Sequence, residues 1–178
     1  SEQGMLVRVL GPTLSMLQGA RLVAQLATST ITPDDLITIP AVVHAVYDGA
    51  ESLLSGVDLD HLERWPVHFV IAGQGQEASR GLAWKWMEGL WAAEPPLWDV
   101  LQAAHGPLQT FWERDITLIA LMDAAPLTEE LVGRLEAVLH PTRHRLIRLS
   151  ATMEGALGIF EHGAALDALM VCDADTAL

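Results

Sequence analysis

Apolar residues along this chain recur mostly three or four positions apart, and the two-residue alternation of a half-buried strand is rare. This pattern predicts a protein built almost entirely of helices. The connections between them are short, which suits antiparallel neighbours. The expected helices cover residues 13–28, 33–39, 40–54, 58–65, 77–93, 97–104, 107–122, 128–140, 141–153 and 158–170.

Two of these helices have clear start signals. Thr32 precedes Pro33 and two aspartates, which is the arrangement of a threonine cap, a proline in the first position and acids in the first turn. Thr128 precedes two glutamates in the same way. Pro40 is expected to end the helix that begins at Pro33 and to start another.

Only residues 67–71 read as a strand, and the glycine-rich turn at 73–76 follows them. Residues 94–97 form the best linker, because each of their two prolines restricts the residue before it. The sequence therefore predicts an all-α fold with two small helical lobes. The expected division is a first lobe at 5–93, a linker at 94–97, a second lobe at 98–172 and a tail at 173–178, with residues 1–4 interpreted as a processing remnant.

Composition narrows the setting in which the chain works. Apolar residues make up 51% of the 178 residues, yet the longest apolar candidate, 115–122, is too short to span a bilayer. The formal net charge of −13, with Lys85 as the single lysine, argues against nucleic-acid or membrane binding. Cys172 is the single cysteine and no secretory signal is recognised, so we expect a protein of a reducing compartment such as the cytoplasm, which is not secreted.

One short motif suggests a cofactor. Gly73, Gly75 and Ala78 follow the predicted strand and open a helix, as in a dinucleotide-binding fingerprint. Such a site holds a pyrophosphate at the helix N-terminus, but it also needs further parallel strands. No such strands are expected here, so the preferred interpretation is a loop before a helix without a cofactor. A small dinucleotide-dependent enzyme stays open as an alternative.

His140 and His144 lie four residues apart, a spacing that can place two metal ligands on one face of a helix. Pro141 falls between them, and no cysteine or acid stands at a familiar ligand spacing, so no metal is predicted. No nucleophile elbow or lysine-containing phosphate loop is present either, and we predict no catalytic residue.

The basic residues cluster near one helix predicted in the second lobe. The simplest interpretation is a solvated face paired with the abundant acids, and the alternative is a contact for an anion or an acidic partner. The residues concerned are Arg143, Arg145 and Arg148.

A family resemblance enters at residues 97–114. Gln102, Phe111 and Arg114, with Asp99 ahead of them, resemble the major homology region of retroviral gag-derived capsid proteins. In that motif a glutamine, a glycine and a glutamate precede an aromatic residue and an arginine. The departures from it are Ala103 at the glycine and Gly106 at the glutamate.

The resemblance implies a two-lobed helical capsid protein that assembles a shell through homo-oligomeric contacts and catalyses nothing. It also implies a virion as the place where the protein works, beside the cytoplasm. It implies a dimer through the helix at 128–140, with Leu131, Leu135 and Val138 as interface candidates. A helical adaptor or effector from a phage or bacterium, binding one protein partner, is the main alternative. The dinucleotide-dependent enzyme is the third.

Overall fold

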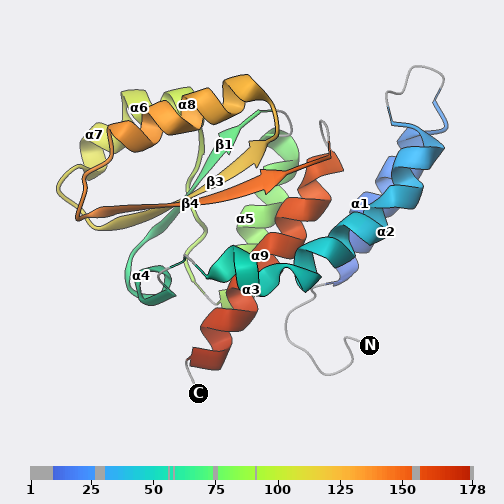
Figure 1. Ribbon diagram of the computed structural model, residues 1–178, viewed down its shortest axis with the longest axis horizontal. Helices are drawn as coiled ribbons and strands as arrows, with labels where there is room; N and C mark the ends of the chain where they lie inside the picture. The colour runs from blue at the N-terminus through green and yellow to red at the C-terminus, as the bar shows by residue number, and fades with distance from the viewer. Residues whose placement is uncertain are drawn as a thin grey trace.

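The computed structural model describes residues 10–26, 31–55, 57, 59–73, 76–90, 92–153 and 157–176. It contains a four-stranded parallel β-sheet with helices on both faces (Figure 1). The protein is therefore α/β, and the prediction of an all-α fold is wrong. The four strands also form one sheet across residues 94–97, so the division into two helical lobes is wrong as well.

The sheet has the strand order β2-β1-β3-β4, and every neighbouring pair is parallel. Its two central strands are nearly continuous apolar runs because helices cover both of their faces. Such runs lack the two-residue alternation that marks a half-buried strand. The strands are β1 (Val67–Ala72), β2 (Leu97–Asp99), β3 (Ile116–Asp123) and β4 (His144–Ala151).

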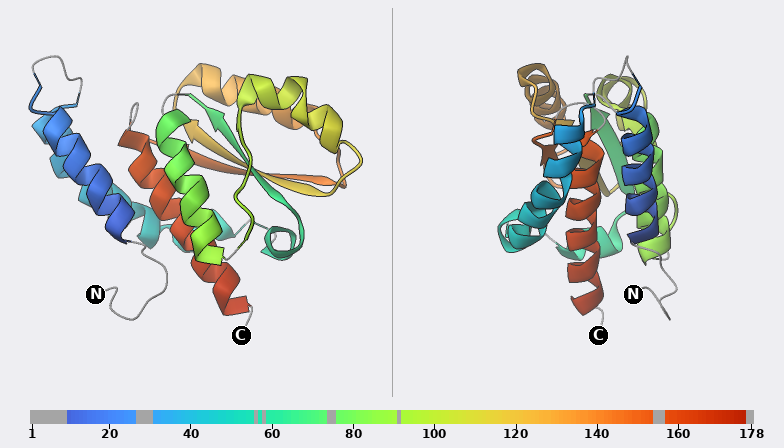
Figure 2. Two further views of the ribbon diagram at one scale, coloured as in Figure 1. Left: turned by 180° about the vertical axis from the view of Figure 1, so that it is seen from behind. Right: turned by 90° about the vertical axis from the view of Figure 1, so that its right-hand side faces the viewer.

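The helices form one layer on each face of the sheet (Figures 1 and 2). Helices α6, α7 and α8 cover one face, and α5 and α9 cover the other, where α2 packs on α9. Figure 2 shows α1 and α2 projecting beside α9, away from the sheet. The bounds are α1 (Leu10–Val23), α2 (Pro33–Asp48), α3 (Ala50–Leu54), α4 (Leu59–Arg64), α5 (Gln76–Leu90), α6 (Val100–His105), α7 (Pro107–Phe111), α8 (Pro126–Ala137) and α9 (Gly158–Thr176).

Alternate residues of the central strands supply two separate cores. Phe69 and Ile119 pack with Trp86 of α5 in the core on the α5–α9 side. Val70, next to Phe69, packs with Val132 of α8 in the core on the opposite side. This alternation is the period of an extended strand, and it fixes which helices each strand residue meets.

The expected start of α2 is confirmed. The Thr32 side chain accepts a hydrogen bond from the Asp35 amide at 3.2 Å, and the Asp35 carboxylate accepts one from the Thr32 amide at 2.7 Å. Pro40, however, does not end this helix, which continues to Asp48. Pro40 thus lies inside the helix, where it removes one backbone hydrogen bond, and the neighbouring Ile39 is buried in the core.

Two predicted helices are partly or wholly strand in the structure. The segment 107–122 is helical only in α7, and its remainder enters β3 at Ile116. The segment 141–153 forms β4. Before β2, the Pro96 carbonyl accepts a hydrogen bond from the Phe69 amide at 2.8 Å. The predicted linker is thus an extended lead-in to the sheet.

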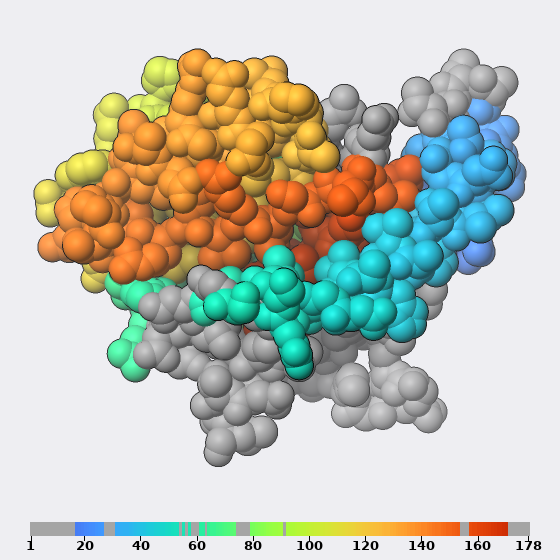
Figure 3. All heavy atoms as spheres, viewed as in Figure 1, coloured from blue at the N-terminus to red at the C-terminus, as the bar shows by residue number. Residues whose placement is uncertain are grey.

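The surface in Figure 3 is formed by β4 and α8 above and by α2 and α3 below. Strand β4 is the last of the sheet on this side and pairs only with β3 among the described strands. None of the helices in the described ranges is long and apolar enough to cross a membrane.

Candidate functional site

The carboxyl ends of β1 and β3 lie side by side at the centre of the sheet, where Ala72 pairs with Met122. From this point the chain leaves in two directions: β1 continues through α5 to β2 on one side, and β3 continues through α8 to β4 on the other. Open α/β sheets bind their ligands in the crevice outside such a switch point. We therefore take this edge, called the switch edge below, as the candidate site.

A close contact between two loop residues forms the centre of the switch edge. Gly73 has a φ of +110°, and a Cβ built on it would lie 2.1 Å from Oδ2 of Asp123. Only glycine combines this backbone conformation with so close a neighbour. The other carboxylate oxygen of Asp123 accepts a hydrogen bond from the Ala125 amide at 3.1 Å, just before α8. The loops after β1 and β3 are thereby fixed against each other.

The beginning of α9 supports the same edge from the β4 side. Glu161 is buried and accepts hydrogen bonds from the Thr152 hydroxyl at 2.8 Å and from the Met153 amide at 2.7 Å. His162 is also buried, and its Nε2 lies 3.0 Å from the Met122 carbonyl oxygen. Burial lowers the pKa of His162, although its backbone hydrogen bonds act against that effect. A neutral His162 donates to the end of β3.

A buried ionic group lies one turn further along α9. The Lys85 ammonium of α5 is 2.6 Å from the Asp167 carboxylate and donates to the Gly163 carbonyl at 3.3 Å. The Tyr47 hydroxyl of α2 donates to the same carboxylate oxygen at 2.8 Å. Burial and the Asp167 charge raise the pKa of Tyr47 above its usual range. These contacts hold α2, α5 and α9 together behind the switch edge.

Of the cofactor fingerprint, Gly73 occupies the expected turn, Gly75 lies outside the described residues, and Ala78 falls in the first turn of α5. Parallel strands are present, contrary to expectation. The acid at the end of β2, Asp99, is where a dinucleotide site would hold a ribose. In this chain its carboxylate caps α6 by accepting from the Leu101 amide at 2.8 Å.

The residues of the capsid-like segment do not form a shared buried network. Gln102 is exposed on α6, and Arg114 is exposed in the turn before β3. The ring of Phe111 packs edge-to-face against His68, with ring centres 4.4 Å apart. Asp99, as noted, caps a helix. Asp99 and Phe111 therefore have separate local structural roles, and Gln102 and Arg114 lie at the surface.

The three arginines are not on a helix and do not converge on one point. Arg143 donates to the Glu113 carbonyl at 2.7 Å, and Arg145 lies over the Trp65 ring at 5.5 Å. Arg148 forms ion pairs with Glu129 and Glu136 of α8. Arg143 and Arg148 are thus held by a carbonyl oxygen or by acids of the same chain. Arg145 is held by the Trp65 ring and by the carbonyl oxygens of Pro141 and His144.

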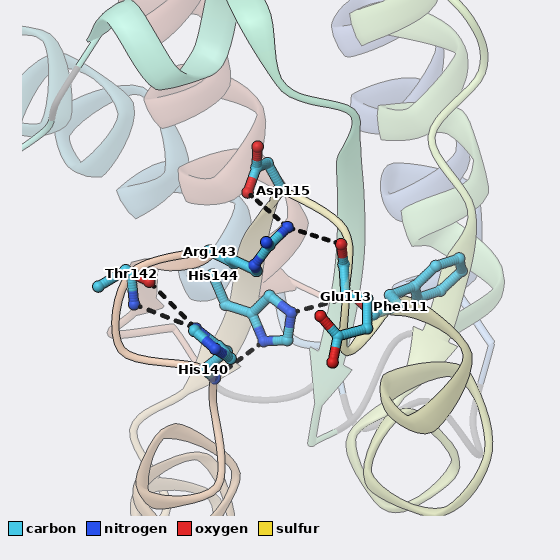
Figure 4. A network of polar contacts seen from close by, with 7 residues as sticks. All are labelled: Phe111, Glu113, Asp115, His140, Thr142, Arg143 and His144. Carbon is cyan, nitrogen blue, oxygen red and sulfur yellow. Dashed lines mark hydrogen bonds and ion pairs between the residues drawn. The ribbon is translucent and has the colours of Figure 1, made fainter.

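The histidine pair lies at the opposite, amino edge of the sheet (Figure 4). His144 accepts the His140 amide at Nδ1, at 3.0 Å, so its Nε2 carries the proton and donates to the Phe111 carbonyl at 3.2 Å. Burial lowers the pKa of His144. Both ring nitrogens are occupied, and the described residues contain no cluster of three or more potential metal ligands. His144 therefore has a structural role as a neutral side chain.

The interface candidates Leu131 and Leu135 lie on α8, and Val138 is the residue that caps its C-terminal end. They line a groove of about 920 Å³ between α8 and the α6–α7 pair. Leu135 is buried, whereas Val138 is 49% exposed. The groove is apolar, with Trp112 at its other wall.

Three residues of the switch edge were missed by the sequence analysis, namely Asp123, Glu161 and His162. A signal for Asp123 was present, because it ends an apolar run and shortly precedes Pro126. That run was interpreted as the end of a helix. Glu161 and His162 carry no local signal, since the burial of α9 all round is what places them inside.

These features define an α/β domain with a parallel sheet and a switch-point site. No protein-family model and no curated protein sequence matches the chain. Among solved structures it is similar to the C-terminal domain of glucosamine-fructose-6-phosphate aminotransferase from Francisella tularensis, with a TM-score of 0.53 and 14% sequence identity. The match covers 91% of this chain and 51% of that chain, so this chain spans about half the length of its neighbour.

The likeness agrees with the α/β fold and overturns the resemblance to retroviral capsid proteins. The capsid motif depended on a few positions within 18 residues, whereas the structural match covers nearly the whole chain. A capsid shell, a helical adaptor and the virion setting are therefore not supported.

Proposed function

We propose that this chain binds a phosphorylated sugar at the switch edge, beside Gly73 and Asp123. The observation that carries the proposal is the contact between these two residues at the topological switch point. Ligands of open α/β sheets bind at this position. The class of ligand is taken from the structural neighbour, whose name contains fructose 6-phosphate.

The phosphate end of the ligand has a natural place after β1. Two glycines, Gly73 and Gly75, stand in the sequence between Ala72 and α5, which is 15 residues long. The N-terminus of such a helix carries a partial positive charge and free amide groups, and it attracts phosphate. The sequence contains no lysine or arginine at positions 73–78, 123–126 and 152–157. Backbone amides, rather than side-chain cations, would therefore hold the phosphate.

The sugar end has a polar partner in Asp123. Its Oδ1 accepts a hydrogen bond from the Ala125 amide. A carboxylate has about four acceptor positions, so Asp123 can also accept a hydroxyl group from a sugar. Its half-buried position makes such a hydrogen bond stronger than one in bulk water.

We further propose that the domain binds its ligand without transforming it. The two buried titratable side chains at this edge, Glu161 and His162, are both occupied by hydrogen bonds that hold the loops and β3. This favours a structural role over acid–base catalysis for them. A sugar phosphate as ligand also favours the cytoplasm as the place of this function.

Titration calorimetry with fructose 6-phosphate tests the proposal, with fructose and inorganic phosphate as separate ligands. We expect fructose 6-phosphate to bind more tightly than either part. Gly73→Ala should abolish binding because the added Cβ displaces Asp123. The matched control is Gly106→Ala, where a Cβ meets nothing within 4 Å and φ is negative. Equal binding by wild type and Gly73→Ala, or no heat with any of the three ligands, would contradict the proposal.

A further inference from the structure

The face of α8 beside the apolar groove remains uncovered. Leu127 is 64% exposed and Val138 is 49% exposed, and across the groove Leu101 and Trp112 are 55% and 41% exposed. Large apolar side chains exposed together on neighbouring helices are typical of an interaction surface. The groove lies over the α6–α8 layer, so it is separate from the switch edge.

A single row of α8 explains what kind of partner this surface fits. The row consists of Leu127, Leu131 and Arg134 of α8 and of Val138, its C-cap residue, and is called the α8 row below. Its spacings are four, three and four residues, so these side chains lie on one face of the helix. The order of these spacings is the same when the row is followed from its C-terminal end. An antiparallel copy of the row therefore matches it position by position.

We propose that the α8 row is the interface of a homodimer, in which α8 pairs antiparallel with α8 of a second copy across a two-fold axis. In this pairing Leu127 meets the second copy's Val138, and Leu131 meets the aliphatic stem of its Arg134. Symmetry repeats each contact, as required of an isologous interface. The helix of the second copy then fills the groove and covers its exposed apolar wall.

The charges on α8 favour this arrangement. Arg134 donates to Glu130 at 2.5 Å within the chain, and both side chains are largely exposed, at 75% and 55%. In the antiparallel pairing, Arg134 of each copy lies close to Glu130 of the other copy. The axis thus places opposite charges together at two equivalent points, whereas a parallel partner would place like charges together.

Sedimentation velocity over roughly 1 to 200 µM protein tests the dimer, a range wide enough to populate both states if the dissociation constant is micromolar. Leu127→Asp should dissociate it without unfolding the chain, because Leu127 is mainly in solvent. Ile37→Asp is the matched control, since Ile37 is 74% exposed on α2, away from the α8 row. Dissociation by Leu127→Asp alone supports the assignment of the interface.

A charge exchange provides the decisive arm. Arg134→Glu places two like-charged pairs across the axis and should weaken the dimer roughly tenfold or more. Adding Glu130→Arg restores opposite charges and should return the dissociation constant to within about threefold of wild type. A misfolded variant would not be rescued in this way. Circular dichroism and fructose 6-phosphate binding report separately on the fold and on the switch edge.

Three results would overturn the inference. They are a monomer throughout the concentration range, a dimer that is indifferent to both Leu127→Asp and Arg134→Glu, and a dimer that Ile37→Asp dissociates as effectively. Retained dimerisation with no sugar-phosphate binding would contradict the proposed function alone.

Discussion

Gly73→Ala perturbs the structure at one defined point. The new Cβ would lie 2.1 Å from Oδ2 and 2.4 Å from Cγ of Asp123, and no contact this short occurs between real atoms. Asp123 must move, and its hydrogen bond to the Ala125 amide is lost with it. In addition, alanine must adopt a φ of +110°, which an L-residue strongly disfavours.

The magnitude follows from these separate effects. A left-handed backbone costs an L-residue about 1 to 2 kcal/mol. Losing the hydrogen bond from the Ala125 amide to the Asp123 carboxylate costs about 0.5 to 1.5 kcal/mol. Replacing glycine restricts the unfolded chain and offsets about 0.4 to 1 kcal/mol. We therefore expect a net loss of about 1 to 3 kcal/mol in the free energy of unfolding, from the same principles.

Thermal unfolding followed by circular dichroism measures the effect. A loss of 1 kcal/mol lowers Tm by about 2 to 4 °C in a chain of this size, so we expect a decrease of about 3 to 10 °C. Gly106→Ala, at an unobstructed site with a negative φ, should lie within about 1 °C of wild type or above it. A Gly73→Ala protein as stable as wild type would refute the contact between the two loops.

Three other changes test different parts of the structure. Lys85→Met should lower the free energy of unfolding in urea by about 3 to 5 kcal/mol, because it leaves the Asp167 charge buried without its cation. Adding Asp167→Leu should recover part of that loss. Equal stability of the single variant and wild type would contradict the buried ion pair. His144 and His162 have folded-state pKa values below the unfolded value of about 6.5. Their contribution to stability should therefore be complete above pH 6.5 and decrease as the pH falls towards 5. A free energy of unfolding that stays constant or rises as the pH falls over that range would contradict this prediction. Asp123→Asn should reduce the preference for fructose 6-phosphate over inorganic phosphate by roughly tenfold, because a hydrogen bond to a charged group contributes about 1.5 to 3 kcal/mol. The control Asp115→Asn, just before the other end of β3, should leave that preference unchanged. Equal effects of the two variants would show that Asp123 does not contact the ligand.

The elements with local signals could be predicted from the sequence. Thr32, Pro33 and the following aspartates specify the start of α2 through contacts within four residues. The strand β1 was recognised from its apolar run and the glycine-rich turn after it. For these elements, short-range chemistry and the final structure agree.

The remaining strands were missed because buried parallel strands lose the period that identifies a strand. In β3 the residues Ile116–Met122 are all buried, since cores lie on both faces of the sheet. An apolar run of this length also fits a buried helix. When β3 and β4 are read as helices, the predicted fold contains no sheet. An all-helical fold then agrees with the resemblance to capsid proteins.

The candidate site could be predicted only in part for the same reason. Gly73 was found because glycine in a turn before a helix is a local signal. Asp123 lies 50 positions further along the chain and meets Gly73 only because β1 and β3 pair in parallel. No pattern within a short window contains that contact. The pairing of the strands, rather than a sequence motif, creates the site.

The most direct test of the sugar-phosphate site is a ¹H–¹⁵N correlation spectrum of the protein titrated with fructose 6-phosphate. We expect the largest shifts at the amides of Ala72, Gly73 and Asp123, with saturation at one dissociation constant. The amides of His140 and His144, at the opposite edge of the sheet, serve as internal controls and should not move. An unchanged spectrum, or shifts centred on the amino edge or on the α8 groove, would contradict a sugar-phosphate site at the switch edge.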